Sequence, residues 1–185
     1  MDHYYDVVDD MYIPGRWYLH DPITDEGCEP YEFTAGTPVH LLSKPTIEIN
    51  RSGFPLDYTR TSFAVPVASP RLAEAFARIA GPDLQCIPVR VGSREGYNIL
   101  VTTRLVRCID EQRSEFMKWT EADGRPDLTG DYRMVTKLHV DTTLIPPDIH
   151  IFRILGWEVA VIVSNEMVEA AKAIGATGLK LTPVD

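Results

Sequence analysis

Most of the middle of the chain consists of short runs in which apolar and polar residues alternate, separated by turn residues. Alternation with a period of two is typical of half-buried β-strands, because successive side chains point to opposite faces of a sheet. Residues 46–49, 63–67 and 85–91 show this pattern and are predicted as strands. Pro66 and Pro88 lack an amide donor, so the second and third strands are expected at an edge or a bulge.

A turn at residues 92–96 separates the third run from a longer one at residues 97–109. Two such runs joined by five residues that contain glycine predict a β-hairpin, and the length of the second run predicts a bent or bulged strand. Further strands are predicted at residues 132–140, 149–152 and 158–163.

Two helices have clear start and stop signals. The first begins after Ser69 as N-cap with Pro70 at the first helical position, and Gly81 ends it. The second begins at Ser164 and ends at Gly175, before a last strand predicted at residues 178–183. Apolar residues at helical spacing give each helix one core-facing side: Leu72, Phe76 and Ile79 in the first, Met167, Ala171 and Ile174 in the second.

These elements predict an α+β fold, with a strand-rich mixed or antiparallel sheet and two short helices packed on it. The second helix and its flanking strands form a possible β-α-β unit. The length of 185 residues suits a single domain, 1–185. Within it we distinguish a turn-rich, aromatic N-terminal segment, residues 1–40, from an α+β body, residues 41–185. We expect the aromatic rings of the segment to pack against the body.

Charge is distributed very unevenly along the chain. The net charge is −9 at pH 7, and residues 1–35 alone hold nine carboxylates and a single base, Arg16. An acidic protein of this kind does not hold nucleic acid or anionic lipid by neutralising phosphates, which requires clustered lysines and arginines. A basic protein partner remains attractive on the same grounds.

The compartment is predicted from several sequence features. The N-terminus has no basic and apolar signal region, and no stretch reaches the ~20 apolar residues of a membrane span. The three cysteines, Cys28, Cys86 and Cys108, are an odd and unpatterned set. Such a set is typical of a reducing compartment, so we expect a cytoplasmic protein without a membrane partner.

Named catalytic motifs are missing from the sequence: there is no phosphate loop, dinucleotide fingerprint, zincin helix or nucleophile elbow. His139, Asp141 and His150 are the best candidates for a metal site or for a small hydrolase with dispersed residues. A polar strand histidine is the more frequent role, so we predict no metal, no cofactor and no enzyme activity.

The acidic, aromatic segment has two open interpretations. It is either a solvated surface that keeps the protein soluble or a recognition surface whose carboxylates steer a basic partner to aromatic anchors. The candidate contact residues share acidic or aromatic side chains within the segment: Asp9, Asp10, Trp17, Asp21, Asp25, Glu26, Glu29, Tyr31 and Glu32.

The chain also resembles a family of bacterial immunity proteins of polymorphic toxin systems, abundant in myxobacteria and long known only as a domain of unknown function (Imm11-like). The most specific matching parts are residues 63–69, 107–110 and 151–164. The resembling pieces cover nearly the whole chain in order: DMYIPGRWYL, LDYTRTSFAVPVAS, QCIPVRV, YNILVTTRLVRCID and HIFRILGWEVAVIVSNEMVEAAKAIGATGLKLTPV.

The resemblance implies a cytoplasmic antitoxin that binds and neutralises a cognate protein toxin without catalysis of its own. It implies no catalytic residues and does not locate the interface. Two alternatives remain open: the small hydrolase above and an assembly factor of a secretion system. The sequence identifies neither the toxin nor the oligomeric state.

Overall fold

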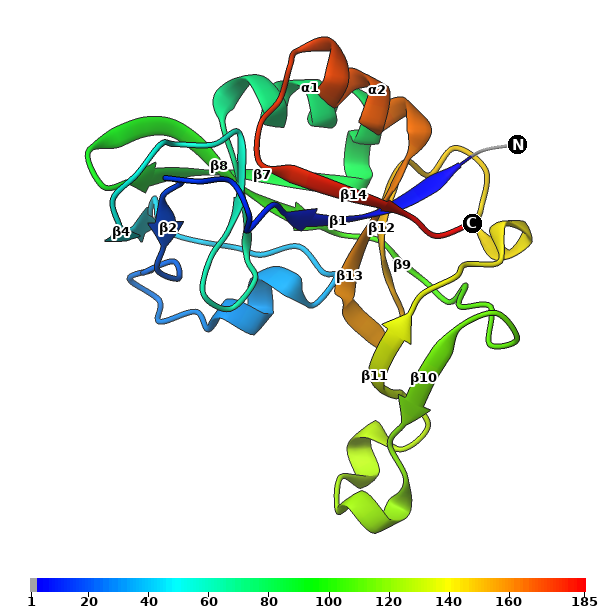
Figure 1. Cartoon of the computed structure of the whole chain (residues 1–185). Coiled ribbons are helices and arrows are strands. Elements are labelled where there is room, and N and C mark those ends of the chain that lie inside the picture. The colour runs from blue at the N-terminus through cyan, green and yellow to red at the C-terminus, as the bar shows by residue number, and fades with distance from the viewer. Residues whose placement is uncertain (1–2) are drawn as a thin grey trace.

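The computed structural model describes residues 3–185, which form two five-stranded β-sheets, two two-stranded sheets and two α-helices (Figure 1). The predicted α+β class, rich in strand with two short helices, is confirmed. The strands are divided among several sheets rather than gathered in one.

The first sheet has the strand order β14-β1-β13-β12-β9 and is antiparallel except where β9 runs parallel to β12. Strand β1 comes from the acidic N-terminal segment, yet it lies between β13 and β14, antiparallel to both. Strands β13 and β14 are therefore parallel, and the predicted β-α-β unit is present with β1 inserted into it. The strands span Tyr4–Asp9 (β1), Leu105–Val106 (β9), Ile151–Ile154 (β12), Trp157–Ser164 (β13) and Leu179–Pro183 (β14).

The second sheet has the order β3-β7-β8-β6-β5. The edge position expected from Pro66 and Pro88 is wrong, because β6 and β7 both lie inside this sheet. Pro66 is the first residue of β6, and β7 has a register shift between Val89 and Val91, just after Pro88. The strands span Thr46–Ile47 (β3), Tyr58–Arg60 (β5), Pro66–Ala68 (β6), Leu84–Val91 (β7) and Arg94–Thr102 (β8).

The hairpin predicted around residues 92–96 is present, but its five-residue turn is wrong. Val91 pairs with Arg94, so the turn is only Gly92 and Ser93, with Gly92 at a φ of +57° that glycine adopts without steric cost. The single strand predicted at residues 97–109 is also wrong. After Thr102 the chain leaves the second sheet, and β9 joins the first.

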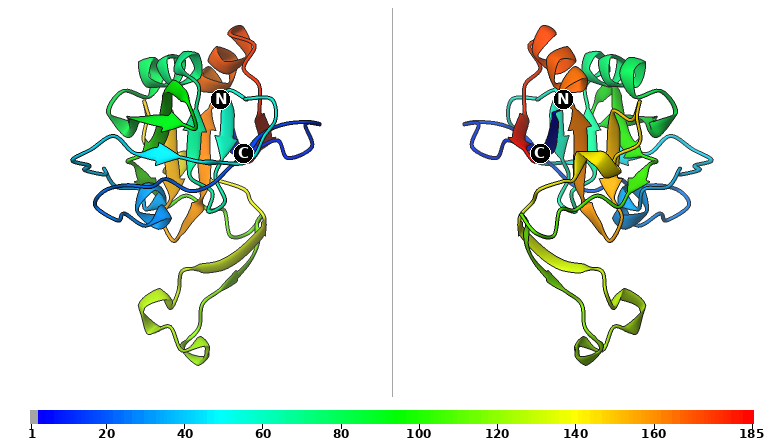
Figure 2. Two further views of the ribbon diagram at one scale, coloured as in Figure 1. Left: turned by 90° about the vertical axis from the view of Figure 1, so that its left-hand side faces the viewer. Right: turned by 90° about the vertical axis from the view of Figure 1, so that its right-hand side faces the viewer.

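A long hairpin, here called the arm, projects from the rest of the molecule (Figure 2). It consists of β10 (Glu115–Lys118) and β11 (Tyr132–Lys137), with the 3-10 helices η3 (Glu121–Asp123) and η4 (Pro126–Leu128) at its tip. A smaller two-stranded sheet pairs β2 (Tyr18–Leu19) with β4 (Ile49–Arg51). The single strand predicted at residues 46–49 is therefore divided between β3 of the second sheet and β4 of this smaller sheet.

The two helices lie side by side on the side of the molecule away from the arm (Figure 1). Helix α1 spans Pro70–Ala80, and its predicted N-cap is confirmed, because Ser69 Oγ accepts a hydrogen bond from the Leu72 amide. Helix α2 spans Asn165–Ala173 and follows Ser164 as predicted. The Ser164 hydroxyl makes no cap and instead contacts His150 Nδ1 at 3.0 Å.

The buried apolar side chains form three clusters. One joins both helices to strands of both large sheets, including Val7 of β1 and Leu100 of β8. A second fills the space between the first sheet and the root of the arm, around Phe152 and Tyr132. The third packs the N-terminal segment onto the second sheet through Trp17 and other buried residues. The arm is thus fixed to the first sheet, whereas the N-terminal segment contributes β1 to the first sheet and packs its later residues on the second.

Candidate partner-binding surface

Strand β1 takes the first acidic residues of the N-terminal segment into the body of the protein. Asp6 and Asp9 lie in β1, and Asp2 lies outside the described residues. Asp9 is buried and accepts a hydrogen bond from Arg16 at 2.7 Å between Nη2 and Oδ2. Arg16 is itself buried and also donates to the Asp10 carbonyl at 2.7 Å. The Asp9 carboxylate therefore closes a loop inside the protein and does not face solvent.

Trp17 lies in the core and not on the surface. Its side chain is 1% exposed, and its indole Nε1 donates to Thr59 Oγ1 at 2.8 Å. The ring packs against Tyr97 at a centroid distance of 5.4 Å. Trp17 thus anchors the N-terminal segment to β5 and β8, and its side chain is not available to a partner. The expectation that the rings of the segment pack against the body is confirmed for Trp17 but wrong for Tyr12 and Tyr31, which are 83% and 69% exposed.

The other predicted contact residues are spread along the segment. Asp10 follows β1, Asp21, Asp25 and Glu26 precede the 3-10 helix η1, Pro30–Thr34, Glu29 is its N-cap, and Tyr31 and Glu32 lie in it. Asp25, Glu26, Glu29 and Tyr31 are exposed, Tyr31 at 69%, and Asp10, Asp21 and Glu32 are half-buried. Glu29 and Glu32 form a capping box in which the Glu29 amide donates to Glu32 Oε1 at 2.8 Å. We call the exposed and half-buried set the acidic face: Asp10, Asp21, Asp25, Glu26, Glu29, Tyr31 and Glu32.

Asp21 connects the acidic face to a tight turn at residues 61–65. Its Oδ1 accepts hydrogen bonds from Thr61 Oγ1 and from the Phe63 amide, the latter at 2.9 Å. The turn places Ala64 at a φ of +64°, a left-handed conformation that costs a non-glycine residue on the order of 1–2 kcal/mol. The strand predicted at residues 63–67 therefore begins only at Pro66.

The same turn displays Phe63, which is 72% exposed. A large aromatic side chain held outward by a strained, hydrogen-bonded turn is a feature of binding surfaces. The alternating pattern assigned Phe63 to a strand, so it was not among the predicted contacts. Its sequence neighbours Thr61 and Ser62, which favour turns, were the only local signal.

The three candidate metal ligands, His139, Asp141 and His150, each contact different neighbours. Asp141 caps the 3-10 helix at Thr142–Leu144 by accepting from the Thr143 amide at 3.0 Å. His150 Nδ1 lies 3.0 Å from Ser164 Oγ and 3.7 Å from Glu166 Oε2. His139 bonds Ser114 through its main chain, and its Nδ1 is buried with no hydrogen-bond partner among the described residues. Within residues 3–185, no three His, Cys, Asp or Glu side chains come together in a metal-binding arrangement.

The cysteines of the body are structural. Cys108 is fully buried, and burial together with the nearby Asp141 raises the pKa of its thiol to about 12. Burial likewise raises the pKa of Cys86. Because the thiolate is the reactive form, neither cysteine is set up as a nucleophile.

Comparison with known proteins identifies the family. No helix within the described residues is long and apolar enough to cross a membrane. No curated protein matches the chain. The model of the immunity protein family Imm11 matches residues 1–185, which is the resemblance noted from the sequence. Because that match spans the whole chain, the protein belongs to the immunity protein family Imm11.

Proposed function

We propose that this protein is an immunity protein that binds a cognate bacterial toxin and neutralises it. The observation that carries the proposal is the match of the immunity family over all 185 residues. The toxin partner follows from the family, and we infer that residues 1–185 act as one domain in the cytoplasm. One apolar cluster that includes residues of β1, α1 and α2 supports a single domain.

We infer that the protein acts by binding and not by catalysis. Two of the three candidates for catalysis have structural side-chain partners, since Asp141 caps a 3-10 helix and His150 contacts Ser164. The third, His139, bonds Ser114 through its main chain. The raised pKa of Cys108 supports the same inference for the thiols. Inhibition would then come from occlusion of the toxin or from holding it inactive.

The acidic face is the proposed contact surface for a toxin with a basic surface. Its carboxylates contribute most of the charge that remains exposed in the N-terminal segment, and Tyr31 supplies an exposed aromatic ring among them. Such an arrangement speeds association with a basic partner and disfavours nucleic acid and anionic membranes. Two buried contacts hold the segment in place: Asp9 bonds Arg16, and Trp17 bonds Thr59 of the body.

Co-expression with the toxin encoded beside this gene tests the function. We expect the protein to rescue growth and to co-purify with the toxin, and unchanged killing would contradict the proposal. Charge reversal of Asp25, Glu26 and Glu29 to lysine tests the surface, with the exposed helix residues Glu74, Glu166 and Glu169 reversed as a control of equal charge. The first variant should associate at least tenfold more slowly at low salt, whereas the control should not.

A further inference from the structure

A pocket of about 360 Å³ lies where the arm meets the body. We call it the notch. Four aromatic side chains line it: Trp119 and Tyr132 from the arm, Trp157 from β13 and Phe63 from the 61–65 turn. Three arginines also line it, Arg60, Arg133 and Arg153. Thr34 of η1 borders the same pocket, which makes the notch continuous with the acidic face.

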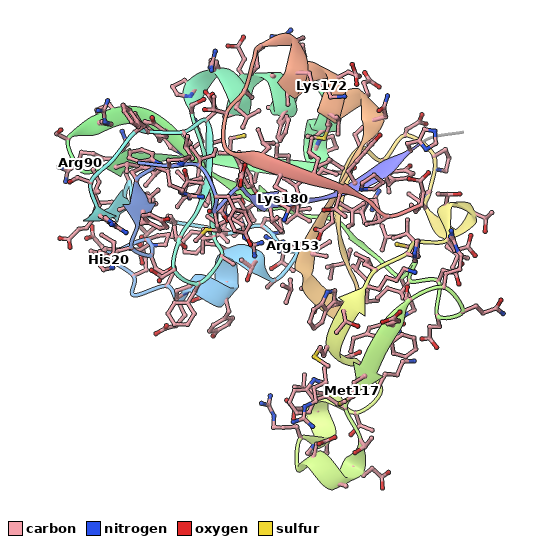
Figure 3. All side chains as sticks on the ribbon, viewed as in Figure 1. His20, Arg90, Met117, Arg153, Lys172 and Lys180 are labelled. Atoms are coloured by element: carbon pink, nitrogen blue, oxygen red, sulfur yellow. The ribbon has the colours of Figure 1, made fainter. Side chains whose placement is uncertain are left out.

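Arg153 has no charged partner in the notch. It lies in β12 between Phe152 and Ile154, is 1% exposed, and is labelled within the body in Figure 3. Its Nη1 donates to the Glu158 carbonyl. Its Nε and Nη2 are buried and have no hydrogen-bond partner among residues 3–185. Burial lowers the pKa of Arg153 to about 10, so the group is still cationic at neutral pH.

The two unpaired donors of Arg153 determine which chemical group can bind them. Nε–H and Nη2–H point in parallel from one edge of the planar guanidinium, and this spacing matches the two oxygens of a carboxylate. The protein uses the same edge elsewhere: Arg71 holds Asp57 with Nε at 2.7 Å from Oδ1 and Nη2 at 2.6 Å from Oδ2. Arg153 lines the notch, and no carboxylate of the described residues bonds this edge. Both donor atoms are covered in the free protein, so a carboxylate reaches them only when the side chains over them move aside.

The charges around Arg153 have both signs, and Glu158 partly offsets the effect of Arg60 on it. Arg60 is a second positive charge close enough to act on Arg153. Arg133 pairs with Asp123 at 2.6 Å and stacks on Trp119. The acidic residues of the pocket are Asp131 and Glu158, and Glu158 Oε1 accepts from the Gly156 amide at 2.9 Å. With Arg133 paired, two arginines and two acids remain, so the preference for an anionic group rests on the two unpaired donors of Arg153.

We propose that the notch receives an aspartate or glutamate side chain of the toxin, whose carboxylate takes the Nε–Nη2 edge of Arg153. This inference rests on the proposed function and specifies one contact of it. Phe63, Trp119 and Trp157 would surround the aliphatic part of the inserted side chain, in the arrangement of a desolvated aromatic and arginine centre typical of binding hot spots. A buried arginine with two unpaired donors destabilises the free protein, and a binding role explains why it is there.

The substitution Arg153→Met separates this role from a structural one. A methionine fills the space without an unpaired charge, so the free protein should keep or raise its Tm. The toxin affinity should fall roughly 30-fold or more, as when one partner of a buried charge pair is removed. Arg153→Lys keeps the charge without the paired donors and should also weaken binding. Arg78→Met, on the exposed face of α1, is the control and should change neither quantity.

A second measurement does not depend on the toxin. The Nε–H signal of Arg153 in a nitrogen-15 NMR spectrum, assigned from its loss in Arg153→Lys, is followed while sodium acetate replaces sodium chloride at constant ionic strength. We expect a saturable shift with acetate. A shift with inorganic phosphate only would overturn the carboxylate assignment, and no shift with either would overturn the site. Absence of any toxin complex with the wild type would instead refute the proposed function, while the acetate result still judges the notch.

Discussion

The carboxylate of Asp57 and the guanidinium of Arg71 form a two-point ion pair. The same carboxylate accepts from Ser69 Oγ at 2.7 Å and from the Thr177 amide at 2.8 Å. Asp57 precedes β5, Ser69 caps α1, and Thr177 follows α2. One buried carboxylate therefore joins the second sheet to both helices.

Asp57→Asn should destabilise the protein by about 2–3 kcal/mol, because the charged acceptor of several hydrogen bonds is replaced by a neutral amide. The half-exposed Arg71 contributes less of this loss than the buried donors. Urea unfolding followed by circular dichroism measures it. Asp127→Asn, which breaks an exposed pair with Arg125, is the control and should change stability by less than about 1 kcal/mol. Equal losses would contradict the assigned role.

Acid should destabilise the wild type through the same residue. Burial alone would raise the pKa of Asp57, but the hydrogen bonds from Arg71, Ser69 and Thr177 outweigh it and hold that pKa well below its usual value of 3.8. A carboxyl with a lowered folded-state pKa stabilises the fold above its unfolded pKa and loses this contribution as the pH falls. The free energy of unfolding should therefore decline below about pH 4 more steeply in wild type than in Asp57→Asn. Parallel pH profiles would refute this.

Asp6 should show the opposite sign. Burial raises its pKa, the nearby Arg60 only partly offsets the effect, and its Oδ1 has no hydrogen-bond partner in the described structure. Ionised Asp6 thus disfavours the folded state above the usual carboxyl pKa. Asp6→Asn should stabilise the protein by about 1 kcal/mol at pH 7, and the gain should vanish in acid, where the carboxyl is protonated in both states. Thermal unfolding at pH 7 and at about pH 3.5 measures both.

Local signals predicted the elements that local physics builds. Ser69 and Pro70 fix the start of α1, and Gly81 fixes its end. The sequence alone predicted both ends of this helix. The position of β1 in the first sheet could not be predicted from the sequence. Its neighbours are set by pairing with residues more than 150 positions away, such as Tyr4 with Ser164. The acidic composition of the first 35 residues suggested a surface segment, whereas the structure places β1 of this segment inside the first sheet.

The candidate site divides in the same way. Acidity alone could not show that Asp9 is buried, since its partner Arg16 is reached only when the loop between them folds back. Arg153 did leave a signal, a single charge inside the apolar run Ile151–Ile154. Its free donors, however, depend on how β12, β13 and the arm meet, which no local pattern specifies.

Trp17→Phe should weaken the fold and leave toxin binding intact. The change removes the indole donor to Thr59 and leaves a cavity in the core, a loss of about 2 kcal/mol or more. The toxin Kd, measured at a temperature where the variant is fully folded, should equal that of wild type. Tyr31→Ala is the reciprocal control: its exposed ring should cost affinity and little stability. A weakened Kd for Trp17→Phe with normal stability would show that Trp17 reaches the partner after all.

Phe63→Ala provides the most direct test of the surface formed by the acidic face and the notch. The side chain is 72% exposed, so its removal should change the free energy of unfolding by less than about 0.5 kcal/mol. It also lines the notch, so a toxin residue seated there would lose an aromatic neighbour, and the toxin Kd should rise at least tenfold, about 1.4 kcal/mol. Phe54→Ala is a close match, because Phe54 is 71% exposed, its amide donates to the Gly15 carbonyl, and it is not among the residues that line the notch. Calorimetric titration measures the toxin Kd of both variants, and only Phe63→Ala should weaken binding. A general effect of exposed phenylalanines on solubility or association would weaken binding equally in both variants. If Phe54→Ala alone weakens binding, the partner surface lies beside β2 and β4, and the notch is not part of it.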